Sequence, residues 1–199
     1  MITLIDYGAS NLASLEGALS RLGFAFRRAA GPADDAGGAL LLPGVGHFGA
    51  AKRRLQGSGW WETLPELAQT RPLLGICLGL QLLAEGSDEA GEEGLGLLSG
   101  TARRLGPGVK VPHMGWSRVK ALTAHPAMKE ADGDWLYFIH SYALELSADT
   151  LLAAEHGRGF TAAAGRGRVL GFQPHPEKSS HGGLRLLKQA LNWMNEERP

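Results

Sequence analysis

The sequence contains a single cysteine, Cys77, among its 199 residues. One thiol cannot form an internal disulfide, and it cannot supply the several sulfur ligands of a cysteine-rich zinc site. Because a lone, unpaired cysteine is typical of proteins in a reduced compartment, we expect a cytoplasmic protein.

The sequence also lacks an excess of charge of either sign, because 20 lysines and arginines balance 20 aspartates and glutamates. A protein that holds nucleic acid by neutralising phosphates carries a positive excess, so we expect no nucleic-acid partner. No apolar run approaches the roughly 18 residues that a membrane-spanning helix needs. The opening residues 1–8 carry no basic segment of the kind that begins a secretory signal. We therefore expect neither membrane association nor export.

Glycine is abundant instead, with 29 glycines and 10 prolines spread along the chain. This distribution predicts many tight turns rather than disorder, since no linker, repeat or low-complexity stretch interrupts the sequence. A length of 199 residues suits one domain. We predict a single domain over residues 1–199.

Short apolar runs of strand length alternate with helical patterns in the first half of the chain. These runs are residues 2–6, 24–28, 39–42 and 73–76. Leucines recur at helical spacing from Leu12 to Leu22, and Ser10 or Asn11 offers an N-cap for that helix. A second apolar helix is predicted from Leu78. The alternation predicts a parallel sheet with helices on both faces.

The second half of the chain is richer in strands. Its strand-like runs are residues 116–120, 135–140, 151–155, 160–164 and 169–172. They indicate a mixed or antiparallel section, and a final helix carries an apolar stripe from Leu184 to Met194. The predicted fold is therefore α/β, with three layers, an open mixed but mainly parallel sheet, helices on both faces and a strand-rich second half.

The segment Gly75–Gly79 has the pattern Gly-x-Cys-x-Gly between a predicted buried strand and a predicted helix. This context is typical of a nucleophile elbow, in which the glycines permit a tight turn that exposes Cys77. The turn directs the N–H of Leu78 toward a reacting carbonyl. The helix N-terminus behind the thiol favours the thiolate. The alternative is a buried, inert cysteine beside packing glycines.

A thiol nucleophile needs a base, and the base needs a group that orients it. His175 and Glu177 follow the predicted strand 169–172 and point to the same side if the segment is extended. The pair is therefore a candidate for both roles, although a structural histidine beside a solvated acid is the alternative.

The segment Pro43–Gly49 contains Gly-x-Gly-x-x-Gly after a strand, which is formally a dinucleotide fingerprint. It follows the third strand rather than the first, so we favour a different use, in which backbone N–H groups bind a developing oxyanion. The His-x-Glu pattern at His175 lacks the cysteine pair of a zinc deaminase, and no phosphate-binding P-loop is present. We therefore predict no cofactor and no metal.

These segments together resemble the class I (triad) glutamine amidotransferases. Gly75–Gln81 resembles the nucleophile motif, His175–Glu177 the His-x-Glu pair and Pro43–Gly46 the oxyanion segment. Further segments resemble one group of this family, glutaminases that serve a cyclase of histidine synthesis. They are Asp6–Gly8 with Asn11, Phe48, Pro112–Trp116 and Tyr137–Tyr142. Two departures, Ser117 in place of asparagine and Ser10 in place of glycine, lie outside the triad.

The resemblance implies a flavodoxin-like fold and a set of site residues. Cys77 would attack the side-chain amide of glutamine, His175 would move the proton, and Glu177 would orient His175. The oxyanion would be bound by the N–H of Leu78 and an N–H from the segment of Gly44, Val45 and Gly46. The amino-acid end of glutamine would be held by three further residues. These are Gln81, Glu89 and Ser141, of which Glu89 is open because the acidic stretch 88–93 allows other alignments.

The resemblance also implies a partner, a cyclase subunit with a (β/α)₈ barrel, in a heterodimer that receives the ammonia. Four residues would face it: Asn11, Trp116, Tyr137 and Lys178. For the two aromatic residues, ordinary packing is the alternative. Other functions stay open at this point: a glutaminase subunit for pyridoxal phosphate or anthranilate synthesis, a thiol peptidase or redox protein, and an inactive docking module.

Overall fold

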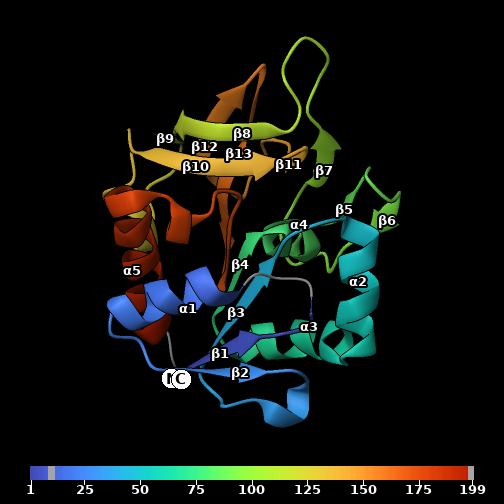
Figure 1. The fold of residues 1–199 in the computed structure, drawn as a ribbon, viewed down its shortest axis with the longest axis vertical. Coiled ribbons are helices and arrows are strands. Elements are labelled where there is room, and N and C mark those ends of the chain that lie inside the picture. Colours follow the sequence, from blue (N-terminus) through green and yellow to red (C-terminus); the bar gives the residue numbers. More distant parts are fainter. Residues whose placement is uncertain (9–11, 197–199) are drawn as a thin grey trace.

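The structure is a computed structural model that describes residues 1–8 and 12–196. An eight-stranded sheet forms its centre (Figure 1). In spatial order the strands are β2 (Phe26–Ala29), β1 (Ile2–Ile5), β3 (Ala39–Gly44), β4 (Leu73–Cys77), β14 (Val169–Phe172), β13 (Arg158–Arg166), β12 (Thr150–His156) and β9 (Lys120–Ala121). The first five are parallel, and the last three are antiparallel to their neighbours. The prediction of a mixed, mainly parallel sheet is confirmed.

Helices cover both faces of this sheet (Figure 1). One face packs on α1 (Leu12–Arg21) and α5 (Ser180–Glu196), and the other packs on α2 (Phe48–Gly57), α3 (Trp60–Thr70) and α4 (Leu78–Leu83). Successive strand residues point to opposite faces, so Leu41 joins the first core and Leu42 joins the second. The predicted three layers are therefore present. Within the described residues, none of the helices has the length and apolarity that crossing a membrane requires.

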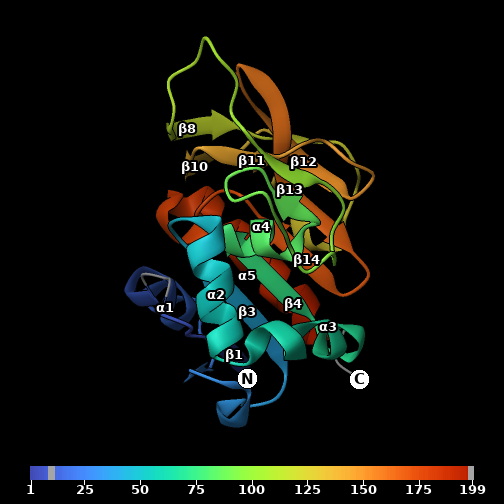
Figure 2. The same cartoon turned by 90° about the vertical axis from the view of Figure 1, so that its right-hand side faces the viewer.

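Two smaller sheets come from the second half of the chain. An antiparallel ribbon pairs β8 (His113–Arg118) with β10 (Trp135–His140) and lies across the carboxyl ends of the parallel strands (Figures 1 and 2). The other sheet contains β11 (Tyr142–Leu144), β7 (Thr101–Arg104), β5 (Gly86–Ser87) and β6 (Glu92–Glu93). Three short 3₁₀ helices are η1 (Pro32–Asp34), η2 (Pro126–Met128) and η3 (Pro176–Lys178).

Several predicted strand bounds differ from the structure by one or more residues, and three of the differences have identifiable reasons. β3 continues past Pro43 to Gly44, although the sequence predicted that it stops before the proline. Its pairing with β1 ends at Leu41, and beyond that residue it pairs only with β4. The missing N–H of Pro43 therefore interrupts no hydrogen bonds to β1. The predicted strand 116–120 is divided, because the chain passes at the buried Val119 from the ribbon to the main sheet. The strand expected at 24–28 begins two residues later, at Phe26, where pairing with β1 begins.

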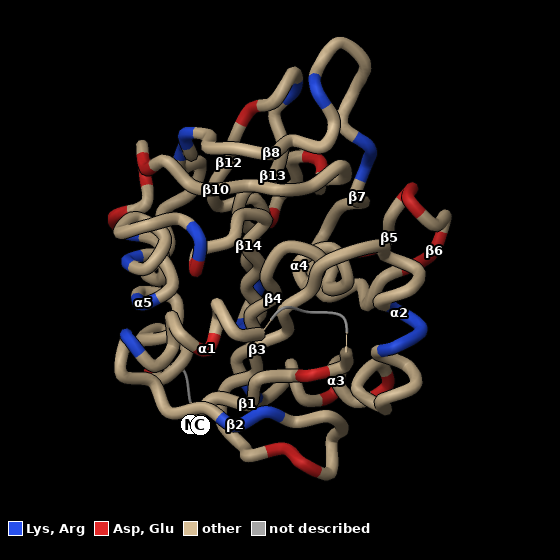
Figure 3. The backbone as a smooth tube through the Cα atoms, in the orientation of Figure 1, with Lys and Arg blue, Asp and Glu red and all other residues tan. Residues whose placement is uncertain are grey.

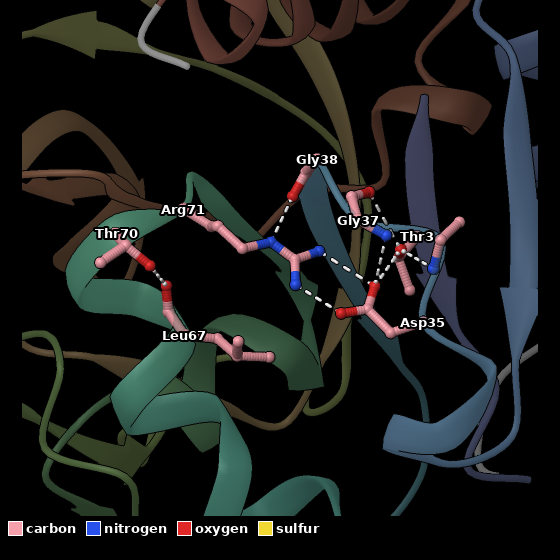
Figure 4. Close-up of polar contacts among 8 residues, drawn as sticks. Thr3, Asp35, Gly37, Gly38, Leu67, Thr70 and Arg71 are labelled. Atoms are coloured by element: carbon pink, nitrogen blue, oxygen red, sulfur yellow. Dashed lines mark hydrogen bonds and ion pairs between the residues drawn. The ribbon is translucent and has the colours of Figure 1, made fainter. Parts of the chain in front are cut away.

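A polar cluster joins the chain at the end of the sheet away from the ribbon (Figure 4). Arg71 forms an ion pair with Asp35, whose Oδ1 also accepts from Thr3 Oγ1 at 2.6 Å. Arg71 Nε donates to the carbonyl of Gly38 at 2.6 Å. The hydrogen bond from Arg71 is the main reason that the pKa of Asp35 falls to about 2. This cluster ties β1, the chain before β3 and the end of α3 together.

Candidate active site

The register of the central strands brings three segments of the site to one edge of the sheet. Gly44 at the end of β3 lies opposite Cys77 at the end of β4. On the other side of β4, Phe172 lies opposite Ile76, so the chain that continues to His175 begins beside Cys77. Because carboxyl ends of parallel strands share an edge, residues far apart in sequence meet here.

Cys77 occupies the turn between β4 and α4, as the sequence predicted. Its backbone has φ 55° and ψ −109°, a left-handed conformation that is strained for a residue other than glycine. The flanking glycines make this turn possible by close packing. A Cβ on Gly79 would lie 1.9 Å from the carbonyl oxygen of Leu42, and one on Gly75 would lie 2.7 Å from the carbonyl carbon of Gly79. The helix therefore approaches β3 at backbone contact.

His175 and Glu177 form a buried pair, with Nδ1 and Oε1 separated by 2.8 Å. The geometry of this contact differs from the expectation, because the segment is not extended. Pro176–Lys178 turns into η3, and that turn, rather than strand alternation, brings the carboxylate back to the imidazole. The other ring nitrogen, Nε2, is buried and has no hydrogen-bond partner among the described residues.

The charge state of His175 is set by its two neighbours. Burial lowers the pKa of this imidazole, but the nearby Cys77 and the hydrogen bond to Glu177 outweigh burial and raise it to about 10. These two neighbours therefore favour the imidazolium form of His175 near neutral pH. An imidazolium beside a sulfur atom is the arrangement of an activated thiol.

The backbone of His175 is fixed to the ribbon. Its N–H donates to the carbonyl of Tyr137 at 2.9 Å, and its carbonyl accepts from Ser179 Oγ at 2.6 Å. Ser179 Oγ in turn accepts from the N–H of Tyr137 at 2.8 Å. Ser179 was not predicted as a site residue, because no local pattern shows that a serine four residues after His175 closes this loop.

A pocket of about 310 Å³ opens over Cys77. Most of the site residues expected from the sequence line it, namely Val45, Gly46, Cys77, Leu78, Gln81, Glu89, Ser141, His175 and Lys178. Gly44 and Glu177 lie behind the pocket, where they line a much smaller cavity with His175. Trp116 and Tyr137 lie on the ribbon. Asn11 and Ser10 lie outside the described residues.

The polar residues of the pocket are held in place by the protein itself. Glu89 Oε2 accepts from the N–H of Phe48 at the start of α2, at 2.7 Å. Gln81 Nε2 donates to the carbonyl of Tyr142 at 2.9 Å. Within residues 1–8 and 12–196, no group of three or more histidine, cysteine, aspartate or glutamate side chains could hold a metal ion.

The fold and the residues on this edge define a class of protein. Residues 3–192 match the family model described as "Glutamine amidotransferase class-I". A solved structure described as a glutamine amidotransferase superposes with a TM-score of 0.77, covering 97% of this chain and 98% of that one, at 19% identity. "PurLQS from Thermotoga maritima" superposes with a TM-score of 0.70 at 17% identity, over 97% of this chain and 98% of that one. These distant structures show the fold, and the chain is a class I glutamine amidotransferase.

Curated relatives narrow the family. "Imidazole glycerol phosphate synthase subunit HisH 2" of Parasynechococcus marenigrum is 45% identical over 98% of this chain and 96% of its own length. The HisH subunit of Exiguobacterium sibiricum is 43% identical over 95% of this chain and 93% of its own length. The chain therefore belongs to the family of HisH subunits of imidazole glycerol phosphate synthase. Membership of this family decides against the other pathways and the thiol peptidase that the sequence alone left open.

Proposed function

We propose that this HisH chain, acting in histidine biosynthesis, hydrolyses glutamine through a thioester on Cys77 and delivers the ammonia to a cyclase subunit. One observation carries the proposal: His175, held by Glu177, shares a pocket with the sulfur of Cys77 on its strained turn. The proposal treats residues 1–199 as one glutaminase domain of the cytoplasm. The partner would be a (β/α)₈-barrel cyclase in a heterodimer.

The chemistry is a two-step acyl transfer. The sulfur of Cys77 attacks the side-chain carbonyl carbon of glutamine, and a new C–S bond forms. The imidazolium of His175 gives its proton to the amide nitrogen as the C–N bond breaks and ammonia leaves. Water then loses a proton to His175 and attacks the thioester, which releases glutamate and restores the thiolate. The carboxylate of Glu177 holds the Nδ1 proton and stabilises the imidazolium throughout.

The oxyanion of each tetrahedral intermediate needs donors beside Cys77. The N–H of Leu78 and an N–H of the Gly44–Gly46 segment would be these donors, and the pairing of Gly44 with Cys77 supports this assignment. Gly46 has φ of 104°, a conformation that favours glycine, and Val45 is 41% exposed at the pocket. Because glycines flank Val45 on both sides, the Gly44–Val45 peptide can rotate. Its N–H can therefore point away from the oxyanion until the partner binds.

The amino-acid end of glutamine would be bound farther along the pocket. Gln81 uses its amide nitrogen inside the protein, which leaves Oε1 to accept from the substrate ammonium. One oxygen of Glu89 is engaged by Phe48, and the other can pair with the same ammonium. Ser141, half-buried in the pocket wall, can donate to the substrate carboxylate.

The outer face of the ribbon is the surface we assign to the cyclase. Alternate residues of β8 and β10 point outward, and Met114, Trp116 and Trp135 are 59%, 47% and 58% exposed. Trp116 packs edge-on against Tyr137 with ring centroids 5.9 Å apart. Figure 3 shows little charge along these two strands. Ile139 on β10 also lines the pocket, so this apolar face borders the place where ammonia is released.

Replacing Trp116 by alanine should weaken binding of the cyclase by about 2 kcal/mol, or roughly thirtyfold in Kd, because a central aromatic anchor would be lost. Calorimetric titration of the cyclase measures this change. Leu122→Ala is the control, because Leu122 is similarly exposed, at 49%, but its backbone N–H is bonded to Leu151 of the main sheet rather than to the ribbon. Equal loss of affinity in both variants would contradict the assignment of this face.

Glutamate release from glutamine tests the whole proposal. We expect the chain alone to be slow, and the chain with a cyclase loaded with its ribulosyl nucleotide to be faster by roughly 10²–10³, the value of one oxyanion donor. The loaded cyclase should then form imidazole glycerol phosphate and an aminoimidazole carboxamide ribotide. No glutamate in any mixture would overturn the proposed function. Equal rates with and without the cyclase would overturn the rotating oxyanion peptide.

A further inference from the structure

Gln173 is a buried polar residue at the active site that the reaction described above does not use. It is the first residue after β14, and its N–H donates to the carbonyl of Ala162 at 2.9 Å. Its side chain is completely buried. The amide nitrogen Nε2 lies 3.7 Å from Cys77 Sγ, within hydrogen-bond distance of a sulfur atom.

The orientation of the Gln173 amide follows from its neighbours. The carbonyl oxygen of Tyr142 can only accept, so the group of Gln81 that lies 2.9 Å from it must be the amide nitrogen. That same nitrogen lies 3.0 Å from the Gln173 amide, which must therefore turn its oxygen toward Gln81. The remaining group of Gln173, the NH₂, then faces the sulfur. Three contacts thus define one direction of donation, from Gln81 through Gln173 to Cys77.

The other polar neighbour of the sulfur has the opposite electrostatic effect. The carbonyl oxygen of Ile139 lies 4.0 Å from Sγ and can accept only from a protonated thiol. A carbonyl dipole facing a thiolate is unfavourable, whereas an N–H donor stabilises the negative charge. Gln173 is therefore the neutral donor that favours the reactive form of Cys77 from the side away from substrate.

We infer that Gln173 is a positioning residue that donates an N–H···S hydrogen bond to Cys77, stabilising the thiolate, and that Gln81 locks this donor in place. Gln81 lines the pocket while bonded to Gln173, so a substrate held by Gln81 also fixes the donor to the nucleophile. The catalytic consequence rests on the proposed function, because it takes Cys77 as the nucleophile. The effect on thiol reactivity does not depend on glutamine chemistry.

The rate of alkylation by iodoacetamide measures this effect directly. The reacting species is the thiolate, whose sulfur forms a bond to the carbon of the reagent as iodide leaves. Cys77 is the only cysteine in the sequence, so the rate reports on this thiol alone. Gln173→Glu keeps an oxygen for Gln81 and replaces the N–H donor by a second oxygen. In this variant we expect the pH profile of alkylation to move to higher pH and the rate at pH 7 to fall roughly tenfold. Gln173→Asn, which withdraws the donor without adding charge, should move the profile in the same direction by less.

Gln69→Glu is the control for an added carboxylate, because Gln69 is exposed near the end of α3, and its profile should equal that of the unaltered protein. Thermal unfolding identifies the variants that fold. If Gln173→Glu does not fold, the smaller Gln173→Asn decides. An unchanged alkylation profile in a folded Gln173 variant would overturn the inference, even if glutamine hydrolysis fell. A shifted profile in a chain that never hydrolyses glutamine would support it and reject the proposed function.

Discussion

A Cys77→Ala variant should lose nearly all glutamate release, with or without the cyclase. The reason is that the thioester cannot form. Ser141 also lines the pocket, but within residues 1–8 and 12–196 its hydroxyl has no hydrogen bond to a base that could activate it. Loss of an acting nucleophile costs roughly 10⁶ in turnover in comparable triads. A coupled assay of glutamate measures the change, and retained binding of the cyclase shows that the variant is folded.

The same variant has a second readout in the imidazole of His175. Burial lowers the pKa of this group, while the nearby Cys77 and the hydrogen bond to Glu177 raise it to about 10. Cys77→Ala removes one of the two groups that raise the pKa, leaving Glu177, and it does not remove the effect of burial. His175 should therefore lose its proton at a lower pH than in the unaltered protein. An NMR titration of the ring measures this. Unchanged titration would show that Cys77 and His175 do not interact.

Gly79→Ala should be among the most damaging single methyl additions in the chain. The new Cβ would lie 1.9 Å from the carbonyl oxygen of Leu42 and 3.0 Å from its carbonyl carbon, and neither atom belongs to a flexible side chain. α4 or β3 must shift, which disturbs the elbow and the buried core around it. We expect a loss of about 4 kcal/mol or more in the free energy of unfolding, measured by denaturant titration.

Gly17→Ala is the matched control, because Gly17 lies on the exposed side of α1 and nothing lies within 4 Å of its added Cβ. Alanine is the better helix former, so this variant should be as stable as the unaltered protein or more stable by about 0.5–1 kcal/mol. Equal stability of the Gly79 and Gly17 variants would contradict the backbone contact between α4 and β3.

The parts of the fold that could be predicted from the sequence are those with local signals. Apolar runs and alternation were enough for the three layers, and Gly75–Gly79 between a strand and a helix was enough for the elbow. β5, β6, β7 and β11 were missed. β5, β6 and β11 have only two or three residues, and the four residues of β7 include two arginines and do not form an apolar run.

The site residues show the same division. His175 and Glu177 were paired from their spacing, but the 3₁₀ turn that joins them was not predicted, because His-Pro-Glu is compatible with an extended segment as well. Gln173 and Ser179 were missed because their contacts, with Cys77 and with the ribbon, depend on which strands lie side by side. Which strands pair over long distances along the chain is set by packing, and it cannot be read from local patterns in a single sequence.

The place of β14 in the sheet also determines when the protein becomes chemically active. Cys77 ends the fourth strand made by the ribosome, whereas β14, His175 and α5 are made last. A nascent or truncated chain therefore carries the thiol without its base, without the Gln173 donor and with the place beside β4 empty. Nonlocal strand pairing of this kind is also among the slower steps of folding. If the proposed mechanism holds, an incomplete copy of the chain therefore cannot hydrolyse glutamine, and ammonia release begins only after synthesis has ended.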